Sequence, residues 1–196
     1  MEYISLGSNC SITYQLSKLG LRKYAYPFDW TKITLNQLIS ILTEDFDDYS
    51  KSLNFVSISN IHPIIELESG TNDLISSSSF ILTNKYKIKF AHELEEKYQL
   101  DELKNRLEQR IKRFIELVDK DVCFVRIELS QLNQSWYSNI IKLHNLLYKY
   151  SSTFKLILII CSQSEFQFPP NIKIYRFDNF SPDWKMDMLD WKSIFI

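Results

Sequence analysis

The chain has 196 residues, of which 45% are hydrophobic and 24% are charged, a composition typical of a globular protein. Lys and Arg total 23 against 24 Asp and Glu, so a net charge of −1 provides no basic excess for nonspecific binding to nucleic acid or to an anionic membrane. The longest apolar run, Leu156 to Cys161, is far shorter than the roughly 20 residues that cross a bilayer. We therefore expect neither a nucleic-acid partner nor a membrane-spanning segment.

The number and spacing of the cysteines indicate the redox state of the cellular compartment and whether a metal site is expected. Cys10, Cys123 and Cys161 form an odd set without a CxxC pair, and the three histidines stand at no spacing typical of a zinc site. This pattern argues against a disulfide framework and favours a reducing compartment. The N-terminal residues also lack the charge order of a secretory signal. We therefore expect a cytoplasmic protein with no metal site and no cofactor.

The N-terminal region predicts a strand, a tight turn and a helix. The apolar stretch Tyr3 to Leu6 ends at Gly7, and Ser8 and Asn9 then supply side chains of the kind that cap helices. Apolar residues follow at helical spacing as far as Gly20, where a helix C-cap glycine is expected.

A second helix is expected after Pro27. Thr34 and Gln37 stand at capping-box spacing, and apolar residues at helical spacing follow them. Four short β-prone runs then predict strands: Phe55 to Ile58, Ile64 to Leu67, Phe80 to Leu82 and Tyr86 to Phe90. The intervening segment Ser69 to Ser79 is expected to be a surface loop. A long amphipathic helix should run from Asp101 to about Asp119.

The last third predicts a β-α-β unit. Val122 to Ile127 and Lys155 to Cys161 are apolar runs without alternation, separated by a helical pattern, and Ile172 to Phe177 adds a further strand. Apolar strands of this kind indicate a parallel sheet covered on both faces. We therefore predict one three-layer α/β domain over residues 1–196 whose mainly parallel sheet also contains the N-terminal strand.

Cys10 stands where that N-terminal strand should give way to a helix, at the sheet edge where α/β proteins hold their ligands. At a helix N-terminus, the pKa of a thiol is expected to fall from about 8.5 towards neutrality. Backbone N–H groups of Gly7, Ser8, Asn9 and Ser11 could then hold an oxyanion. The alternative is that Cys10 is a small buried side chain in the first helical turn.

A nucleophilic thiol needs a base, and His92 is the preferred candidate because it follows the expected strand Tyr86 to Phe90. His62 precedes a proline in irregular sequence. His144 lies close to the apolar face of a helix, so we expect it to be a packed or surface helix residue and not the base.

Several carboxylates could orient the His92 ring: Asp29, Glu93, Asp183, Asp187 and Asp190. We prefer Asp29 to Glu93, because side chains of adjacent residues diverge and Glu93 is therefore poorly placed to reach the neighbouring ring. Asp29 lies in the stiff segment Pro27 to Trp30, whose aromatic residues could exclude water. That segment either lines a pocket or forms a tight turn anchored by its aromatics.

The segment ISLGSNCSITYQLSKLGLRKYAYPFDW resembles a family described as papain-like cysteine peptidases (DUF1796), as do the later segments YKIKFAHEL, RLEQRIKRF, VCFVRIE and DWKMDMLDW. The most specific part is SLGSNC joined at this spacing to YPFDW. The family usually has Asp after the histidine, where this chain has Glu93. The resemblance implies a cysteine-dependent hydrolase or acyl transferase in which Cys10 attacks and His92 is the base. It also implies a papain-like α+β fold, whereas the periodicity favours a parallel sheet.

Two other functions stay open at this stage. A non-catalytic α/β module could bind an anionic ligand at the SLGSNC turn with help from Arg106 or Arg110. These two arginines and Arg113 recur at helical spacing, a pattern that is more typical of a solvated helix face. An SGNH-like esterase with Ser8 as the nucleophile would share the strand-turn-helix pattern, but its usual Asp is absent. A sulfur-to-imidazole distance within hydrogen-bond reach would favour the cysteine enzyme.

The parallel sheet also predicts where a pocket should lie. The carboxyl ends of parallel strands gather at one edge, so Gly7 to Cys10 should lie beside the end of the Val122 strand, near Glu128. The pocket should open at that edge, roofed by the Ser69 to Ser79 loop.

Overall fold

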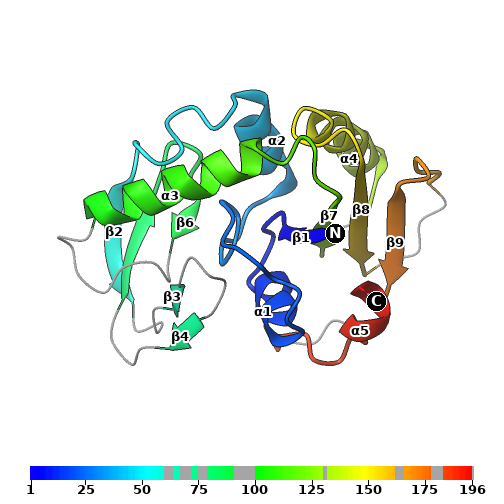
Figure 1. Ribbon diagram of the computed structural model, residues 1–196, viewed down its shortest axis with the longest axis horizontal. Coiled ribbons are helices and arrows are strands. Elements are labelled where there is room, and N and C mark those ends of the chain that lie inside the picture. The colour runs from blue at the N-terminus through cyan, green and yellow to red at the C-terminus, as the bar shows by residue number, and fades with distance from the viewer. Residues whose placement is uncertain are drawn as a thin grey trace.

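The structure, a computed structural model, describes residues 1–59, 64–66, 72–74, 79–90, 100–129, 132–161, 166–177 and 183–195. Its centre is a four-stranded sheet with helices on both faces (Figure 1). The strands are β1 (Glu2–Ser5), β7 (Val122–Glu128), β8 (Phe154–Ile160) and β9 (Ile172–Arg176). They lie in the order β1-β7-β8-β9, and every neighbouring pair is parallel. The prediction of a mainly parallel α/β sheet is confirmed.

The helices form two layers around this sheet. On one face lie α2 (Leu35–Thr43), α3 (Leu100–Ile115) and α4 (Gln134–Leu147), and on the other α1 (Ser11–Lys18) and the short α5 (Trp191–Phe195) (Figure 1). β7 is buried along its whole length. Its side chains alternate between two hydrophobic cores, one on each face of the sheet. A strand buried on both faces must be apolar throughout, which explains the absence of alternation in its sequence.

The predicted helix signals also hold. The Thr34 hydroxyl oxygen accepts a hydrogen bond from the Gln37 amide at 3.3 Å, and the Gln37 Oε1 accepts one from the Thr34 amide at 2.9 Å, which completes the capping box of α2. Gly20 follows α1 with a φ of +66°, the left-handed conformation expected of a C-terminal glycine. The third predicted helix is shorter than expected, since α3 ends at Ile115.

The middle of the chain forms antiparallel pairs. β2 (Asn54–Ser59) pairs with β5 (Ser79–Thr83), which pairs with β6 (Lys89–Phe90), and β3 (Ile64–Glu66) pairs with β4 (Asn72–Leu74).

Two expectations for this region need correction. The predicted strand from Tyr86 to Phe90 is reduced to its last two residues, because Lys87 adopts a left-handed φ of 60° and its amide closes a turn onto Asn84 at 2.8 Å. The expected loop Ser69 to Ser79 contains β4, and most of its other residues lie outside the described part of the chain.

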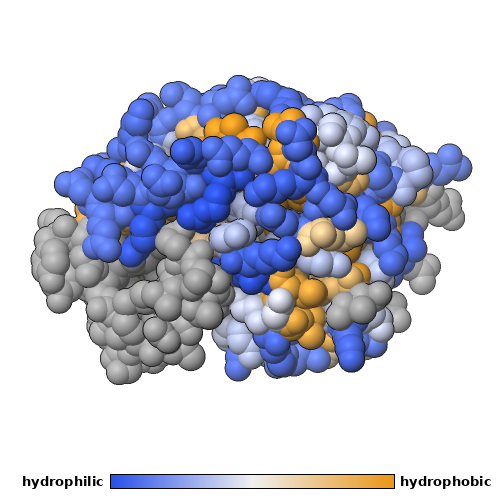
Figure 2. All heavy atoms as spheres, in the orientation of Figure 1, coloured by the Kyte–Doolittle hydropathy of each residue, from blue (hydrophilic) through white to orange (hydrophobic). Residues whose placement is uncertain are grey.

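Hydrophilic residues cover most of α3 on the face shown in Figure 2, while hydrophobic residues reach the surface between α1 and α5. No helix in the described ranges combines the length and the hydropathy that a membrane span needs.

Candidate functional site

The chain leaves β1 through a turn with two consecutive left-handed residues, Gly7 at a φ of +74° and Ser8 at +80°. A side chain at position 7 would place its Cβ 3.2 Å from Ile33, so this position requires glycine for space as well as for its backbone conformation. Ser8 is held by its hydroxyl, which accepts a hydrogen bond from the Ile127 amide at 3.3 Å. The turn is therefore fixed beside the carboxyl end of β7, as the sequence predicted.

Cys10 occupies the N-cap position of α1, and its side chain is partly exposed. Its carbonyl accepts the first helical hydrogen bond, from the Tyr14 amide at 3.0 Å. The predicted placement of this thiol, at a strand-to-helix junction on the carboxyl edge of a parallel sheet, is confirmed.

The amides of the turn divide into two groups. The Gly7 amide donates to the Ser5 hydroxyl at 3.2 Å, and the Ser11 amide donates to the Asn9 side-chain oxygen at 3.2 Å. Within the described ranges, the amides of Ser8 and Asn9 have no acceptor. Of the four residues predicted to hold an oxyanion, Ser8 and Asn9 therefore have available amides, and Gly7 and Ser11 have engaged ones.

The electrostatic environment of the thiol differs from the expectation. Burial raises the pKa of Cys10 to about 11, because the charged thiolate loses its hydration. The predicted fall of this pKa towards neutrality is wrong, because desolvation by burial raises it. A thiol with this pKa is protonated at neutral pH and needs a base before it can attack.

The C-terminal segment packs against the residues on either side of Cys10. Met186, itself buried, places its Sδ 3.6 Å from the Ser11 Oγ and 3.9 Å from the Asn9 Nδ2. The Gln15 amide group, one turn further along α1, donates to the Asp187 carboxylate at 2.8 Å. The segment around Met186 is thus tied to α1 beside Cys10.

A cavity of about 510 Å³ opens at the carboxyl end of β7. Ser8, Ile33, Arg126, Glu128 and Trp136 are among the residues that line it. A cavity therefore lies at the predicted edge, but Ser8 is the residue of the turn that lines it, and Cys10 is not among its lining residues. The segment expected to roof it lies mostly outside the described residues, so that prediction stands untested.

The cavity floor contains a buried ion pair that the sequence analysis missed. Arg126 donates from Nε to Glu128, from Nη1 to the Leu6 carbonyl at 2.9 Å and from Nη2 to the Ile33 carbonyl at 3.0 Å. Burial lowers the pKa of Arg126, while Glu128 acts in the opposite direction. The guanidinium thus joins the end of β1, the loop before α2 and β7 beneath the turn. Its signal in the sequence is two charged residues, two positions apart, within an otherwise apolar strand.

Asp29 is buried and has four donors. Its Oδ1 accepts from the Thr13 hydroxyl at 3.1 Å, and its Oδ2 accepts from the Tyr26 amide at 2.8 Å and from Arg22 at 2.7 and 3.2 Å. The carboxylate thereby ties α1 to the segment that follows it. The tight-turn interpretation of Pro27 to Trp30 is supported by the Asp29 amide, which donates to the Tyr26 carbonyl at 3.2 Å.

The histidine predictions are only partly testable. His144 is buried on α4 with its Nε2 2.9 Å from the Asn171 Oδ1, so the expectation that it is a packed helix residue is confirmed. His62, His92 and Glu93 lie outside the described residues. The distance between Cys10 and His92, and the carboxylate that orients His92, therefore stay predictions.

The C-terminal acids considered as alternatives make contacts of their own. Asp187 pairs with Lys18 at 2.9 Å, which lowers its pKa. Asp190 accepts hydrogen bonds from the amide and the hydroxyl of Ser193, which lower its pKa and hold the start of α5. Asp183 accepts from the Lys185 amide at 3.1 Å.

The arginine row of α3 is not the solvated face that its spacing indicated. Arg110 is almost fully buried, and Arg113 donates to the Ala25 carbonyl. Arg106 lies 3.8 Å from Glu102, one helical turn away. The contact of Arg113 with Ala25 ties α3 to the segment that follows α1.

No group of three His, Cys, Asp or Glu side chains in the described ranges is arranged to hold a metal ion.

Comparison with known proteins adds to this geometry. A family model for DUF1796, described as "Putative papain-like cysteine peptidase", matches residues 1–164. The chain is 30% identical over 219 aligned positions to the uncharacterized protein R408 of Acanthamoeba polyphaga mimivirus, an alignment that covers 99% of this chain and 96% of the viral protein. No solved structure matches. The family match covers the turn, Cys10, the segment Pro27 to Trp30 and β7, and on this basis the chain belongs to the DUF1796 family.

Proposed function

We propose that the protein is a cysteine-dependent hydrolase or acyl transferase in which Cys10 is the nucleophile and His92 is the base. One observation carries this proposal: the Cys10 thiol lies at the N-terminus of α1, directly after a turn with two left-handed residues, at the carboxyl edge of a parallel sheet. The family description, which names cysteine peptidases, points to the same chemistry.

The raised pKa of Cys10 defines what the base must do. Because the resting thiol is protonated, His92 removes the proton as Sγ attacks the carbonyl carbon. The carbonyl oxygen then becomes an oxyanion, for which the available amides of Ser8 and Asn9 are the proposed donors. Collapse of this intermediate expels the leaving group, which takes the proton back from His92. Water or another acceptor then cleaves the thioester.

Asp29 is the proposed orienting carboxylate. Its Oδ2 receives three N–H donors, whereas its Oδ1 receives one hydroxyl, so Oδ1 is the oxygen with room for an imidazole N–H. Asp29→Asn should therefore slow thiol labelling at Cys10, while Glu93→Gln should do little.

We also propose a reducing compartment such as the cytoplasm, because all three cysteines are free thiols in the structure.

The proposal is tested by incubating the chain with an activated ester, p-nitrophenyl acetate, and mapping the acetyl group by mass spectrometry. We expect the acetyl group on Cys10, its loss in Cys10→Ser, and acylation at least 100-fold slower in His92→Ala. Cys161→Ser, which removes another partly exposed thiol, is the matched control and should acylate normally.

Two outcomes would overturn the assignment. Ester turnover that survives in Cys10→Ser and disappears in Ser8→Ala would move the nucleophile to Ser8. Absence of any adduct on Cys10, with His92→Ala indistinguishable from the wild type, would favour a non-catalytic binding module.

A further inference from the structure

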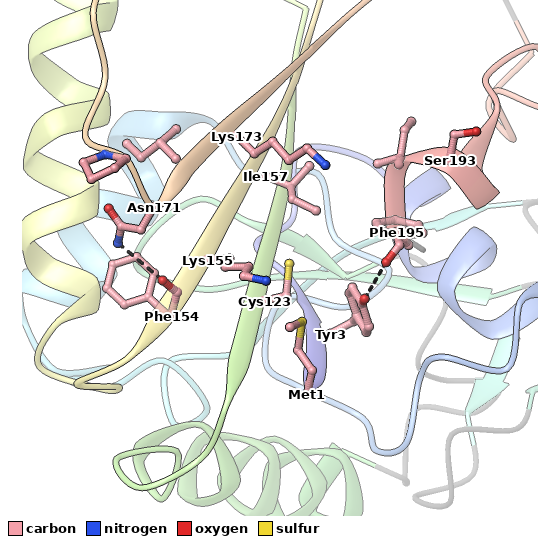
Figure 3. Close-up of a pocket in the computed structure, with 13 residues that line it drawn as sticks. Met1, Tyr3, Cys123, Phe154, Lys155, Ile157, Asn171, Lys173, Ser193 and Phe195 are labelled. Carbon is pink, nitrogen blue, oxygen red and sulfur yellow. Dashed lines mark hydrogen bonds between the residues drawn. The ribbon is translucent and has the colours of Figure 1, made fainter.

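A second cavity, of about 820 Å³, lies at the opposite end of the sheet from the Cys10 turn. Its walls come from the amino-terminal parts of the four parallel strands and from α5 (Figure 3). The strand register places Tyr3 beside Cys123 and Cys123 beside Lys155, each the second residue of its strand. The proposed cysteine chemistry uses none of these residues.

The floor of this cavity is apolar. Cys123 and Ile157, at 1% and 4% exposure, belong to the buried face of the sheet. Phe195 of α5 closes one side, held by the Tyr3 hydroxyl, which donates to the Phe195 carbonyl at 2.6 Å. The hydrophobic residues that reach the surface between α1 and α5 lie on this side of the sheet (Figure 2).

Two lysines stand at the edge of this apolar floor. Cys123 is the register partner of Lys155, and Ile157 is the partner of Lys173, so both lysines project from the same face of neighbouring strands (Figure 3). Both lower the pKa of the Cys123 thiol, which burial nevertheless raises to about 12, so their charges act on the cavity floor.

Neither lysine has a carboxylate partner among the described residues. The Lys173 Nζ lies 4.7 Å from the centre of the Tyr175 ring, a contact that leaves its charge uncompensated. Asp121, whose charge also acts on Cys123, lies 3.6 Å from the amino group of Met1. As far as the described residues go, the cavity therefore combines an apolar interior with an excess of positive charge.

The Asn171 side chain, which also lines the cavity, is already engaged. Its Nδ2 donates to the Phe154 carbonyl at 3.3 Å, and its Oδ1 contacts His144 at 2.9 Å. The Met1 amino group pairs with Asp121, and the Ser193 hydroxyl donates to Asp190 at 2.6 Å. Among the described lining residues, the ammonium groups of the two lysines are therefore the charged groups without a carboxylate partner.

We propose that this cavity binds an anionic amphiphile, namely a single carboxylate on an unbranched apolar chain, such as a medium-chain fatty acid. The carboxylate would lie between Lys155 and Lys173, and the chain would cover Cys123, Ile157 and Phe195. Charge complementarity and the apolar floor together carry this choice, and the volume falls within the range of about 300–1,000 Å³ that is usual for small-molecule sites.

The test is calorimetric titration of the full chain with decanoate, with amide chemical shifts to locate the bound molecule. We expect saturable binding with shifts concentrated in β8 and β9. Lys155→Met and Lys173→Met should each weaken binding about tenfold, the loss expected for one charge-assisted contact. Lys142→Met, an exposed lysine on α4, is the matched control and should bind like the wild type.

Two further ligands make the result decisive. Decanol tests the role of the charge and acetate tests the role of the chain, and both should bind at least tenfold more weakly than decanoate. Equal binding of decanol, equal binding of acetate, or unchanged affinity in both lysine variants would overturn the proposal. If Lys155→Met fails to fold, Lys155→Gln replaces it. Because Cys10 does not line this cavity, the outcome is independent of the proposed catalysis.

Discussion

The pH dependence of Cys10 alkylation separates a base-assisted thiol from a merely buried one. In His92→Ala, burial should leave the pKa of Cys10 at about 11, against 9.0 for an unperturbed thiol. At pH 7 this means about 100-fold less thiolate. A thiolate of higher pKa is intrinsically more nucleophilic, which recovers roughly tenfold. The variant should therefore alkylate about tenfold more slowly than a small-molecule thiol at this pH.

The sign of the pH effect follows from the same argument. Alkylation of the variant should rise about tenfold per pH unit as the thiol deprotonates, up to about pH 11. In the wild type, neutral His92 removes the proton, so the rate should instead follow the imidazole and level off above about pH 6.5.

The assay is reaction with iodoacetamide at pH steps from 5 to 10, quenched and read on the Cys10 peptide by mass spectrometry. Circular dichroism at each pH checks that both chains stay folded. Identical curves for the two chains, both rising steadily towards pH 11, would refute the role of His92.

Three further predictions concern the framework of the site. Gly7→Ala should destabilise the fold by about 1–3 kcal/mol more than Gly20→Ala, because both glycines have a positive φ but only a Cβ at position 7 would meet a neighbour at 3.2 Å. Urea denaturation of the two variants measures the difference, and equal losses in the free energy of unfolding would contradict the prediction. Asp29→Ala should lower the free energy of unfolding by about 3–5 kcal/mol in the same assay, because it leaves the buried Arg22 guanidinium without its carboxylate. A loss below about 1 kcal/mol would be incompatible with that contact. Glu128→Ala should lower the free energy of unfolding by a similar ~3–5 kcal/mol for the same reason, whereas an apolar replacement of both members of its ion pair should lower it by less than either single change. A loss in the double variant equal to the sum of the two single losses would argue that the pair is not coupled.

Much of the sheet could be predicted because its physical cause is local. β7 and β8 are buried on both faces, so their sequences lack alternation, and that absence indicated parallel pairing. The capping box at Thr34 and the turn at Gly7 are likewise encoded by a few neighbouring residues. The position of the turn beside β7 followed from the shared direction of parallel strands.

The properties that could not be predicted depend on contacts between distant segments. The pKa of Cys10 is raised by burial, and no local pattern around Cys10 encodes that burial. Met186, from the far end of the chain, packs against the neighbouring residue Ser11. Arg110 occupies a helix position whose spacing resembles a solvated face, yet it is buried. The cavity at Lys155 and Lys173 arises where helices leave part of the sheet uncovered, which depends on three-dimensional packing.

The most direct test of the proposed nucleophile compares the thiols within one molecule. The chain is treated at pH 7 with less than one equivalent of iodoacetamide, and peptide mapping then gives the fraction modified at each cysteine. Cys161, which is also partly exposed, is the internal reference. The proposal predicts modification of Cys10 at least tenfold faster than that of Cys161, with this preference lost in His92→Ala. Modification of Cys161 ahead of Cys10 in the wild-type chain would contradict it.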